Sequence, residues 1–277
     1  MTRPAIPLAG VIGNPVGHSL SPGLHGHWLR RYGIRGHYVP LQVGEDDLAQ
    51  VIRALPRMGF VGANVTIPHK RAVLDIADQA SDRAILMGAA NTLTFLEDGR
   101  ILADNTDAHG FLANLRQEAP DWDPSRGPAC VLGAGGAARA VIAALLEAGV
   151  PEVILTNRTR PKAEALRADL GTRVRVLDWV QAGNAVDEAE TVVNTTSLGM
   201  EGQPELRVPL DGLRPGKLVT DIVYAPLRTR LLRVAEDEGC TTVDGLGMLL
   251  HQAVPGFERW FGKRPEVDRE ARDAVLK

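Results

Sequence analysis

The sequence has little cysteine and almost no excess of charge of either sign. Its 277 residues include two cysteines, Cys130 and Cys240, which form neither a CxxC pair nor a spaced set of metal ligands. A reduced, cytoplasmic compartment is therefore expected. Lys and Arg number 31 against 34 Asp and Glu, a net charge of −3. This balance gives no electrostatic basis for binding nucleic acid or an anionic membrane.

Long apolar runs are also missing. Residues 1–11 hold two prolines and lack the apolar core of a signal peptide, and no run approaches the ~20 residues of a membrane span. Internal repeats and low-complexity segments are absent as well. Hydrophobic residues still make up 44% of the chain, which is enough for a real core. Because the chain is longer than most single domains, we expect two compact units.

Short β-rich runs alternate with amphipathic helical stretches along nearly the whole chain, which predicts an α/β fold with parallel sheets. The first third predicts strands at 8–12, 37–41 and 62–66, helices at 23–32, 46–55 and 83–87, and a hairpin of 91–95 with 101–103. A helix at 108–119 leads into a connection at 120–128 that is rich in Pro, Asp and Gly.

A second unit is expected to begin after this connection. It predicts strands at 129–132, 153–156, 174–177, 191–194, 218–221 and 241–243, with helices at 136–147, 160–170 and 226–238. Two further helices, at 247–261 and 267–275, have no obvious place in this alternation.

The clearest motif is the run 131–139, where an apolar strand leads into glycines that open an alanine-rich helix. Glycine allows a tight turn and a close approach to a pyrophosphate, and the helix N-terminus supplies free N–H groups. The residues expected to bind a dinucleotide here are Gly133, Ala134, Gly135, Gly136 and Ala137. The alternative is a glycine-rich turn of some other α/β domain, against which the order strand, turn, helix, strand argues.

The end of the next strand distinguishes the two common dinucleotides. An NAD site expects an acidic residue there, about 20 residues after the glycines. Here the run is Asn157, Arg158, Thr159 and Arg160, with Lys162 close behind. Arg158 offers a planar donor fork suited to a 2′-phosphate, so NADP is favoured. A solvated basic turn is the alternative.

Four polar clusters follow predicted strands in the first third, where α/β folds collect ligands. Lys70 and Asp107 are candidates for handling the proton of an alcohol or carbonyl. Candidate donors to a substrate carboxylate are Ser19, Ser21 and Thr66, and candidate partners of hydroxyl groups are Asn64 and Asn91.

Each of these residues also has a structural interpretation. Ser19 or Ser21 would suit a helix N-cap, as would Asp107, and Asn91 would suit a turn. Lys70 alone would suit the solvated surface. The histidines show no zinc pattern, so no metal is expected.

In combination, these clusters resemble the shikimate dehydrogenase family. The matching strings occur in family order at 14–22, 62–70, 88–92, 104–107, 133–137, 157–159, 194–200 and 244–253. Ala108 stands where the family usually has glycine. The resemblance implies a two-domain α/β protein, in which residues 1–106 and 244–277 form an α/β substrate domain. A Rossmann-like, doubly wound NADP-binding domain, residues 107–243, is inserted between them.

The resemblance also implies roles for individual residues. Lys70 would be the catalytic acid and base, assisted by Asp107. The substrate carboxylate would be bound near Ser19, Ser21, Thr66 and Tyr224, and the ring hydroxyls by Asn64, Asn91, Asp107 and Gln252. Further cofactor contacts would come from Ile222, Gly245 and Met248, with Asp82 nearby.

The implied reaction is the reversible, NADPH-dependent reduction of 3-dehydroshikimate to shikimate, a step of chorismate and aromatic amino-acid biosynthesis. A quinate or aminoshikimate dehydrogenase on the same scaffold is one alternative. A non-catalytic NADP-binding regulatory module is another, although it would need neither Lys70 nor Asp107. The resemblance implies a small-molecule substrate and a monomer or homodimer.

Overall fold

The computed structural model describes residues 6–276, which form two compact units. The first contains the described residues up to Thr106 together with those from Gln252 onward, and the second runs from Asp107 to His251. The boundary therefore falls within helix α10 (Leu246–Phe261). Residues 1–5, part of the segment in which no signal peptide is predicted, lie outside the described range.

The first unit is built on a six-stranded sheet in the order β2-β1-β3-β5-β6-β4. Its strands are β1 (Leu8–Gly13), β2 (His37–Gln42), β3 (Phe60–Val65), β4 (Gln79–Ala80), β5 (Thr92–Phe95) and β6 (Ile101–Asp104). The sheet is mixed: β1, β2 and β3 are parallel, as are β4 and β6, whereas β5 runs antiparallel to both β3 and β6. The hairpin predicted at 91–95 and 101–103 is confirmed, and the expectation of parallel strands is corrected for β5 alone. The short turn between β5 and β6 is the reason, since only antiparallel strands can be joined so briefly.

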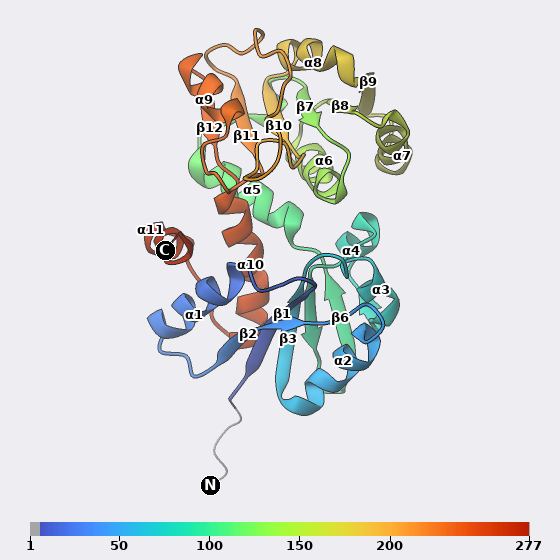
Figure 1. Cartoon of the computed structure of the whole chain (residues 1–277), viewed down its shortest axis with the longest axis vertical. Helices are drawn as coiled ribbons and strands as arrows, with labels where there is room; N and C mark the ends of the chain where they lie inside the picture. The colour runs from blue at the N-terminus through green and yellow to red at the C-terminus, as the bar shows by residue number, and fades with distance from the viewer. Residues whose placement is uncertain (1–5, 277) are drawn as a thin grey trace. The chain divides into compact units, whose positions relative to one another are not determined.

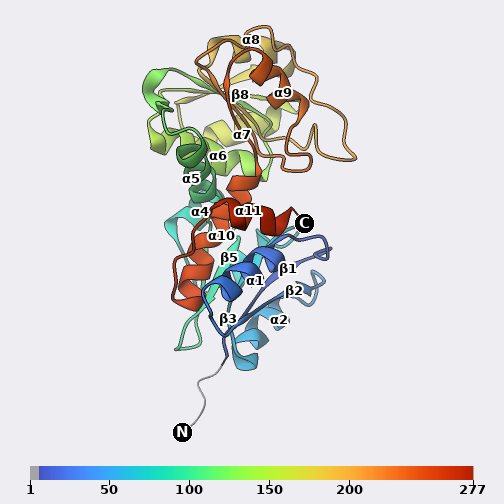
Figure 2. The ribbon, with the colours of Figure 1, turned by 90° about the vertical axis from the view of Figure 1, so that its left-hand side faces the viewer.

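Helices cover both faces of this sheet. On one face α2 (Leu48–Ala54), α3 (Ala72–Ile76) and α4 (Asp82–Met87) bury Ile52, Val73 and Ala84 with strand residues such as Val65. Toward the other face, Trp260 of α10 packs against Gly62 of β3, and its indole nitrogen donates to the Leu93 carbonyl at 3.0 Å. Helices α1 (Ser21–Arg31) and α11 (Arg269–Val275) lie side by side (Figures 1 and 2).

The second unit contains the doubly wound sheet that the alternation predicts. All its strands are parallel, in the order β12-β11-β10-β7-β8-β9. They are β7 (Ala129–Leu132), β8 (Val153–Asn157), β9 (Val174–Asp178), β10 (Thr191–Asn194), β11 (Leu218–Asp221) and β12 (Thr241–Val243). The four central strands are almost wholly buried, as expected for a parallel sheet with helices on both faces, whereas the edge strands β9 and β12 are partly exposed.

Successive residues of β7 bury opposite faces of this sheet. Ala129 and Val131 join the core under α5 (Asp107–Glu118), α6 (Gly136–Ala148) and α7 (Arg160–Leu170), whereas Cys130 and Leu132 join the core under α8 (Ala182–Glu188) and α9 (Arg230–Asp237). The ribbon in Figure 1 shows α6 and α7 beside β7 and β8. The period-two burial follows from the alternation of side chains along a strand.

Three parts of the chain differ from the predicted helices. The helix expected at 226–238 begins only at Arg230, because Thr229 adopts an extended backbone and its hydroxyl accepts from the Leu232 N–H. Helices α3 and α8 were not predicted. The carboxyl end of α8 is closed by Lys217, which is fully buried and donates to the carbonyls of Val186 and Asp187, each at 2.7 Å.

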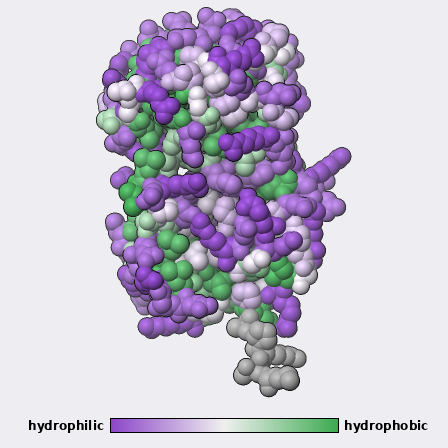
Figure 3. Space-filling view, turned by 180° about the vertical axis from the view of Figure 1, so that it is seen from behind, coloured by the Kyte–Doolittle hydropathy of each residue, from purple (hydrophilic) through white to green (hydrophobic). Residues whose placement is uncertain are grey.

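The surface in Figure 3 mixes hydrophilic and hydrophobic residues, with hydrophilic ones predominating on the face shown. Within residues 6–276, every helix is too short or too polar to span a bilayer.

Candidate functional site

The turn after β3 carries Lys70. It is anchored by His69, a buried residue whose Nε2 lies 2.8 Å from the Val43 carbonyl oxygen. The Lys70 carbonyl accepts from the Ala90 N–H at 2.7 Å, which ties this turn to the segment before β5. Lys70 itself is half-buried. The backbone around it is therefore fixed, while its side chain keeps contact with solvent.

Thr66 begins the same turn at the end of β3. Its N–H donates to the Ile12 carbonyl at 2.9 Å. A β-carbon on Gly13 would lie only 2.5 Å from the Thr66 methyl group, so the two residues are closely packed. Thr66 is half-buried. The carboxyl ends of β1 and β3 are thus in direct contact.

Asn64 and Asn91 form the centre of a buried hydrogen-bond network. The Asn64 carboxamide oxygen accepts from the Tyr38 hydroxyl at 2.7 Å, and its nitrogen donates to the Asn91 carbonyl at 3.2 Å and to the Thr92 hydroxyl at 3.3 Å. The Asn91 carboxamide nitrogen donates to Gln252 Oε1 at 3.3 Å. Three predicted substrate-binding residues, from β3, the segment before β5 and α10, are thereby joined.

Thr106 closes the network at the end of the first unit. Its N–H donates to Asn91 Oδ1 at 2.9 Å, and its hydroxyl donates to the Gln252 carbonyl at 2.8 Å. Asn91 therefore does satisfy a backbone group, as its structural interpretation expects. It also holds the Gln252 side chain through its nitrogen, so the two interpretations are compatible.

The serines do not cap helix α1 as their structural interpretation supposes. Leu20 precedes the helix and no side chain caps it; instead the Ser21 N–H donates to the Ser19 hydroxyl at 3.3 Å. The Ser21 side chain hydrogen-bonds to the Tyr38 hydroxyl. The side chain of Leu20 has no acceptor, so the helix begins without a side-chain cap, and Pro22 in the first turn has no N–H that would need a partner. Ser21 thus belongs to the Asn64 network.

The remaining predicted residues are divided between the units. Asp82 is the exposed first residue of α4, after its N-cap Ser81. Helix α5 begins at Asp107, so Asp107 is its first residue and not the N-cap residue before it, which corrects the N-cap interpretation. Asp107 belongs to the second unit, whereas Lys70 belongs to the first. Tyr224, 36% exposed, also belongs to the second unit.

Asp104, the last residue of β6, is held by an ion pair with Arg259 of α10. Burial alone would raise the pKa of its carboxyl group, but hydrogen bonds from Ser81 and Arg259 outweigh burial and lower that pKa. Arg259 Nη2 lies 2.6 Å from Asp104 Oδ2, which attaches α10 to the sheet.

In the second unit, the glycine turn has the geometry of an anion-binding site. Gly133 has φ +105°, and a β-carbon there would lie 2.6 Å from the Thr196 methyl group. Gly135 is the N-cap of α6 without a capping side chain, and β-carbons on Gly135 and Gly136 would meet nothing within 4 Å. The first N–H groups of α6 are therefore open to a ligand.

The basic turn after β8 is organised by Asn157. Its oxygen accepts from the Ala134 N–H at 3.2 Å and its nitrogen donates to the Thr159 carbonyl at 2.8 Å, so the two predicted cofactor segments touch. Arg160 is paired with Glu164 at 3.0 Å and with Asp178 at 2.7 Å.

Arg158 and Lys162 are exposed, and within residues 6–276 neither forms an ion pair. Among the basic residues of this turn, Arg158 and Lys162 are thus the cations left available for a phosphate.

The last predicted cofactor residues lie together at the end of β11 and the start of α10. A β-carbon on Gly245 would lie 2.4 Å from the Ile222 carbonyl, and the side chains of Ile222 and Met248 pack against the same core. Asn114 of α5, which was not predicted, donates to the Asp244 carbonyl at 2.8 Å and holds this segment.

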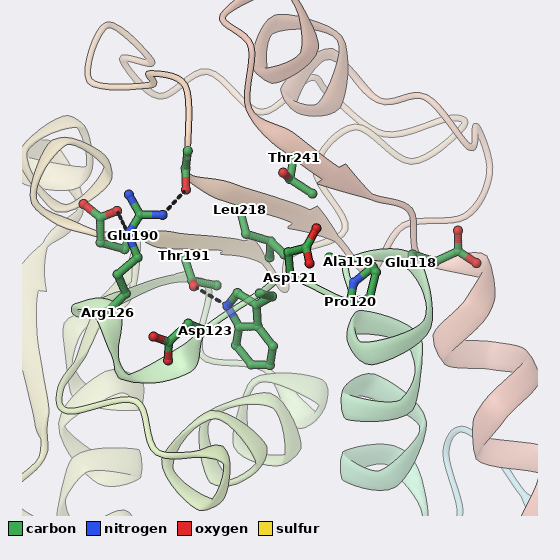
Figure 4. A pocket seen from close by; sticks show the side chains of 12 residues that line it. Glu118, Ala119, Pro120, Asp121, Asp123, Arg126, Glu190, Thr191, Leu218 and Thr241 are labelled. Carbon is green, nitrogen blue, oxygen red and sulfur yellow. Dashed lines mark hydrogen bonds and ion pairs between the residues drawn. The ribbon is translucent and has the colours of Figure 1, made fainter.

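A cavity of about 310 Å³ lies elsewhere in the second unit (Figure 4). Its wall includes Trp122, Glu190 and the first residues of three strands, Thr191, Leu218 and Thr241. It is therefore at the amino ends of the strands, whereas the glycine turn follows the carboxyl end of β7. Ligands of open parallel sheets bind at the carboxyl ends, and none of the predicted site residues lines this cavity.

Tyr38, Thr92 and Thr106 were missed from the sequence as parts of the network. The two threonines lie inside polar strings that were recognised, so their position was available as a signal. Tyr38 lies within a strand of ordinary composition, and nothing in the sequence marks it.

Comparisons with known proteins agree with this geometry. Family models match residues 11–93 (shikimate dehydrogenase substrate binding domain), 117–200 (shikimate / quinate 5-dehydrogenase) and 245–269 (shikimate 5′-dehydrogenase C-terminal domain). The shikimate dehydrogenase (NADP(+)) of Cereibacter sphaeroides strain ATCC 17029 is 69% identical, over 98% of this chain and 97% of its own.

Solved structures are similar over the same length. A quinate dehydrogenase from Corynebacterium glutamicum in complex with NAD has a TM-score of 0.91 at 30% identity, covering 98% of this chain and 99% of its own. A shikimate 5-dehydrogenase from Thermus thermophilus in complex with NADP(H) and shikimate has a TM-score of 0.86 at 37% identity, with the same coverage. The chain belongs to the shikimate dehydrogenase family.

Proposed function

We propose that this protein is an NADP-dependent shikimate dehydrogenase that interconverts 3-dehydroshikimate and shikimate. The observation that carries the proposal is the network joining Ser21, Asn64, Asn91 and Gln252, side chains from four separate segments. Such convergence of hydroxyl and carboxamide groups suits a small ligand rich in hydroxyls. Relatives that are 60–69% identical over nearly the whole chain carry the name shikimate dehydrogenase (NADP(+)), which supports the same reaction.

The domain roles follow from this assignment. We propose that residues 1–106 and 244–277 bind the substrate and that residues 107–243 bind NADP. Ser19, Ser21, Thr66 and Tyr224 are proposed for the carboxylate, because hydroxyl groups donate to it without adding charge. Asn64, Asn91, Asp107 and Gln252 are proposed for the ring hydroxyls, since carboxamides and carboxylates accept from them.

Lys70 is proposed to move the proton of the reacting oxygen. As an ammonium group it donates to the oxygen on which negative charge develops during ketone reduction, and as an amine it takes the proton back during shikimate oxidation. Asp107 would orient that ammonium and share its charge. The fixed backbone on either side of Lys70 sets the point from which its side chain extends.

The second unit fits NADP. The open N–H groups at the start of α6 suit the pyrophosphate, and Arg158 suits a 2′-phosphate. Asn157 and Thr159 shape this turn, Lys162 adds a further cation, and Ile222, Gly245 and Met248 form an apolar surface for the nicotinamide. NADPH, when bound, supplies the hydride.

The direct test is the absorbance of reduced nicotinamide with purified protein, shikimate or quinate, and NADP or NAD. Fast reduction with shikimate and NADP alone is the expected result. Reduction only with quinate would instead assign the protein to quinate oxidation, the reaction of the alternative on the same scaffold. NADP binding without turnover on either substrate would favour a regulatory module.

Replacing Lys70 with Ala tests its role separately. We expect turnover to fall by about 10² to 10⁴ with a much smaller change in shikimate affinity, because a proton-transfer group is lost and a binding group is not. Turnover that survives largely intact would show that another group transfers the proton.

The preference for NADP has a matched pair of variants. Arg158→Gln should raise KM for NADP by roughly tenfold to a hundredfold while leaving KM for NAD unchanged, because the charge-assisted bonds to the 2′-phosphate are lost. Arg160→Gln should have the smaller effect, because Glu164 and Asp178 already engage that guanidinium. Equal effects of the two variants would contradict the assignment of Arg158.

A further inference from the structure

Tyr38 occupies a position in β2 from which it reaches the proposed substrate site without facing solvent. In the sheet register it is aligned with Ala9 of β1, and Ala9 is aligned with Gly62 of β3. Side chains alternate along a strand, so Tyr38 and Asn64, two residues beyond Gly62, are on the same face. Tyr38 is 8% exposed, and its hydroxyl donates to Asn64 Oδ1 at 2.7 Å.

The ring of Tyr38 is held in place by its neighbours. It stacks on the ring of His25 with centroids 3.9 Å apart and planes 10° from parallel. Trp28, Phe257 and Trp260 surround His25 in turn, with ring centroids 5.6, 5.7 and 5.9 Å away. A tyrosine packed in this way offers its hydroxyl at one fixed point.

This fixed hydroxyl determines which way the Asn64 carboxamide faces. A phenolic O–H bond to Oδ1 leaves the nitrogen to the Asn91 carbonyl and the Thr92 hydroxyl, where both of its hydrogens are used. A carboxamide oxygen has two lone pairs, so Oδ1 keeps one for a further donor. Asn64 is thereby set as an acceptor for a hydroxyl group.

We propose that Tyr38 is a positioning residue that presents Asn64 as an acceptor to a ring hydroxyl of the substrate. The inference rests on the proposed function for the identity of the substrate. The hydrogen bond between the Ser21 side chain and the Tyr38 hydroxyl also connects Tyr38 to the proposed carboxylate site. Tyr38 is buried beneath these residues and acts through them.

Tyr38→Phe tests the proposal, because it removes one hydroxyl and keeps the ring that stacks on His25. We expect KM for shikimate to rise about fivefold to tenfold, since Asn64 loses a buried partner, while kcat changes less than about threefold. KM for NADP should remain unchanged. Tyr32→Phe is the matched control: the Tyr32 hydroxyl accepts from the Glu266 N–H at 3.0 Å in an exposed place, and its loss should leave KM for shikimate unaltered.

A double-mutant cycle separates positioning from general stability. In an Asn64→Ala background, Tyr38→Phe should cause no further rise in KM, because the residue through which it acts is gone. Additive effects of the two changes, or an unchanged KM in Tyr38→Phe alongside a lowered melting temperature, would overturn the proposal and leave Tyr38 a packing residue. An unchanged KM in Asn64→Ala would overturn it as well.

Failure of the proposed function is distinguishable from failure of this inference. If the wild-type protein does not reduce NADP with shikimate, the substrate is wrong. In that case the role of Tyr38 is tested through hydrogen exchange of the Asn64 side-chain amide, whose resonances are identified by their absence in Asn64→Ala. Slow hydrogen exchange in the wild type and in Tyr32→Phe but fast exchange in Tyr38→Phe supports the inference, and equal exchange rates in all three overturn it.

Discussion

His25 should make the protein lose stability on mild acidification. It is fully buried, neither ring nitrogen has a hydrogen-bond partner within residues 6–276, and burial lowers its pKa from 6.5 to about 3. The folded protein therefore keeps the ring neutral at a pH at which the unfolded chain protonates it. Stability is fully present above pH 6.5 and is lost as the pH falls from there toward 3.

The magnitude follows from the gap between the two pKa values. Each pH unit below 6.5 costs about 1.36 kcal/mol, so at about pH 5 the cost is roughly 2 kcal/mol relative to about pH 7.5. This figure depends only on the folded pKa lying well below 5. His25→Phe should abolish this part of the pH dependence, because phenylalanine cannot be protonated and retains a ring to stack on Tyr38.

The assay is denaturant unfolding at the two pH values, followed by tryptophan fluorescence, which is sensitive here because Trp28 and Trp260 flank His25. Any constant effect of the substitution on packing cancels when the two pH values are compared. His37→Phe is the control, since His37 is exposed and its replacement should leave the pH dependence in place. If wild type and His25→Phe lose the same free energy of unfolding between the two pH values, the reasoning is refuted.

Three further substitutions have outcomes set by contacts described above. Gly133→Ala should weaken NADP binding at least tenfold and lower the melting temperature, because a side chain is strained at φ +105° and meets Thr196; titration of NADP binding checks this. Lys217→Met should cost about 2 kcal/mol in guanidinium unfolding, because the buried Val186 carbonyl loses its Lys217 donor and the Asp187 carbonyl keeps only the bond from Arg214. Asp104 has a lowered pKa, so it stabilises the fold above its unfolded value of 3.8, and this stability is lost as the pH falls through the folded pKa. Arg259→Gln should shift that loss to higher pH in an acid-unfolding series.

The second unit was predictable from the sequence almost strand for strand. Its four central strands are buried on both faces, so they appear as short apolar runs, and glycines or polar residues mark their ends. The glycine turn and the basic run after β8 are local features, and the structure brings them into contact through Asn157 and Ala134.

The first unit was less predictable because its site depends on contacts across long stretches of sequence. The polar strings containing Asn64 and Asn91 identify the candidates, but not the hydrogen bond to Gln252, 161 residues away along the chain. Helix α3 has five residues, too short for a clear helical period, and α8 of the second unit, with seven residues, was missed for the same reason. Tyr38 could not be recognised, because its role comes from the register of β2 beside β1 and not from its neighbours in sequence.

The division of the chain within α10 has a consequence for biosynthesis. The second unit is continuous, so all its residues are translated before the C-terminal part of the first unit. The first unit contains the segment that precedes the second unit, but it also takes Phe257, Arg259 and Trp260, which are translated after the second unit. The first unit is therefore completed only after the second unit has been translated. Until then, His25 lacks the rings of Phe257 and Trp260, and Asp104 lacks its ion-pair partner Arg259.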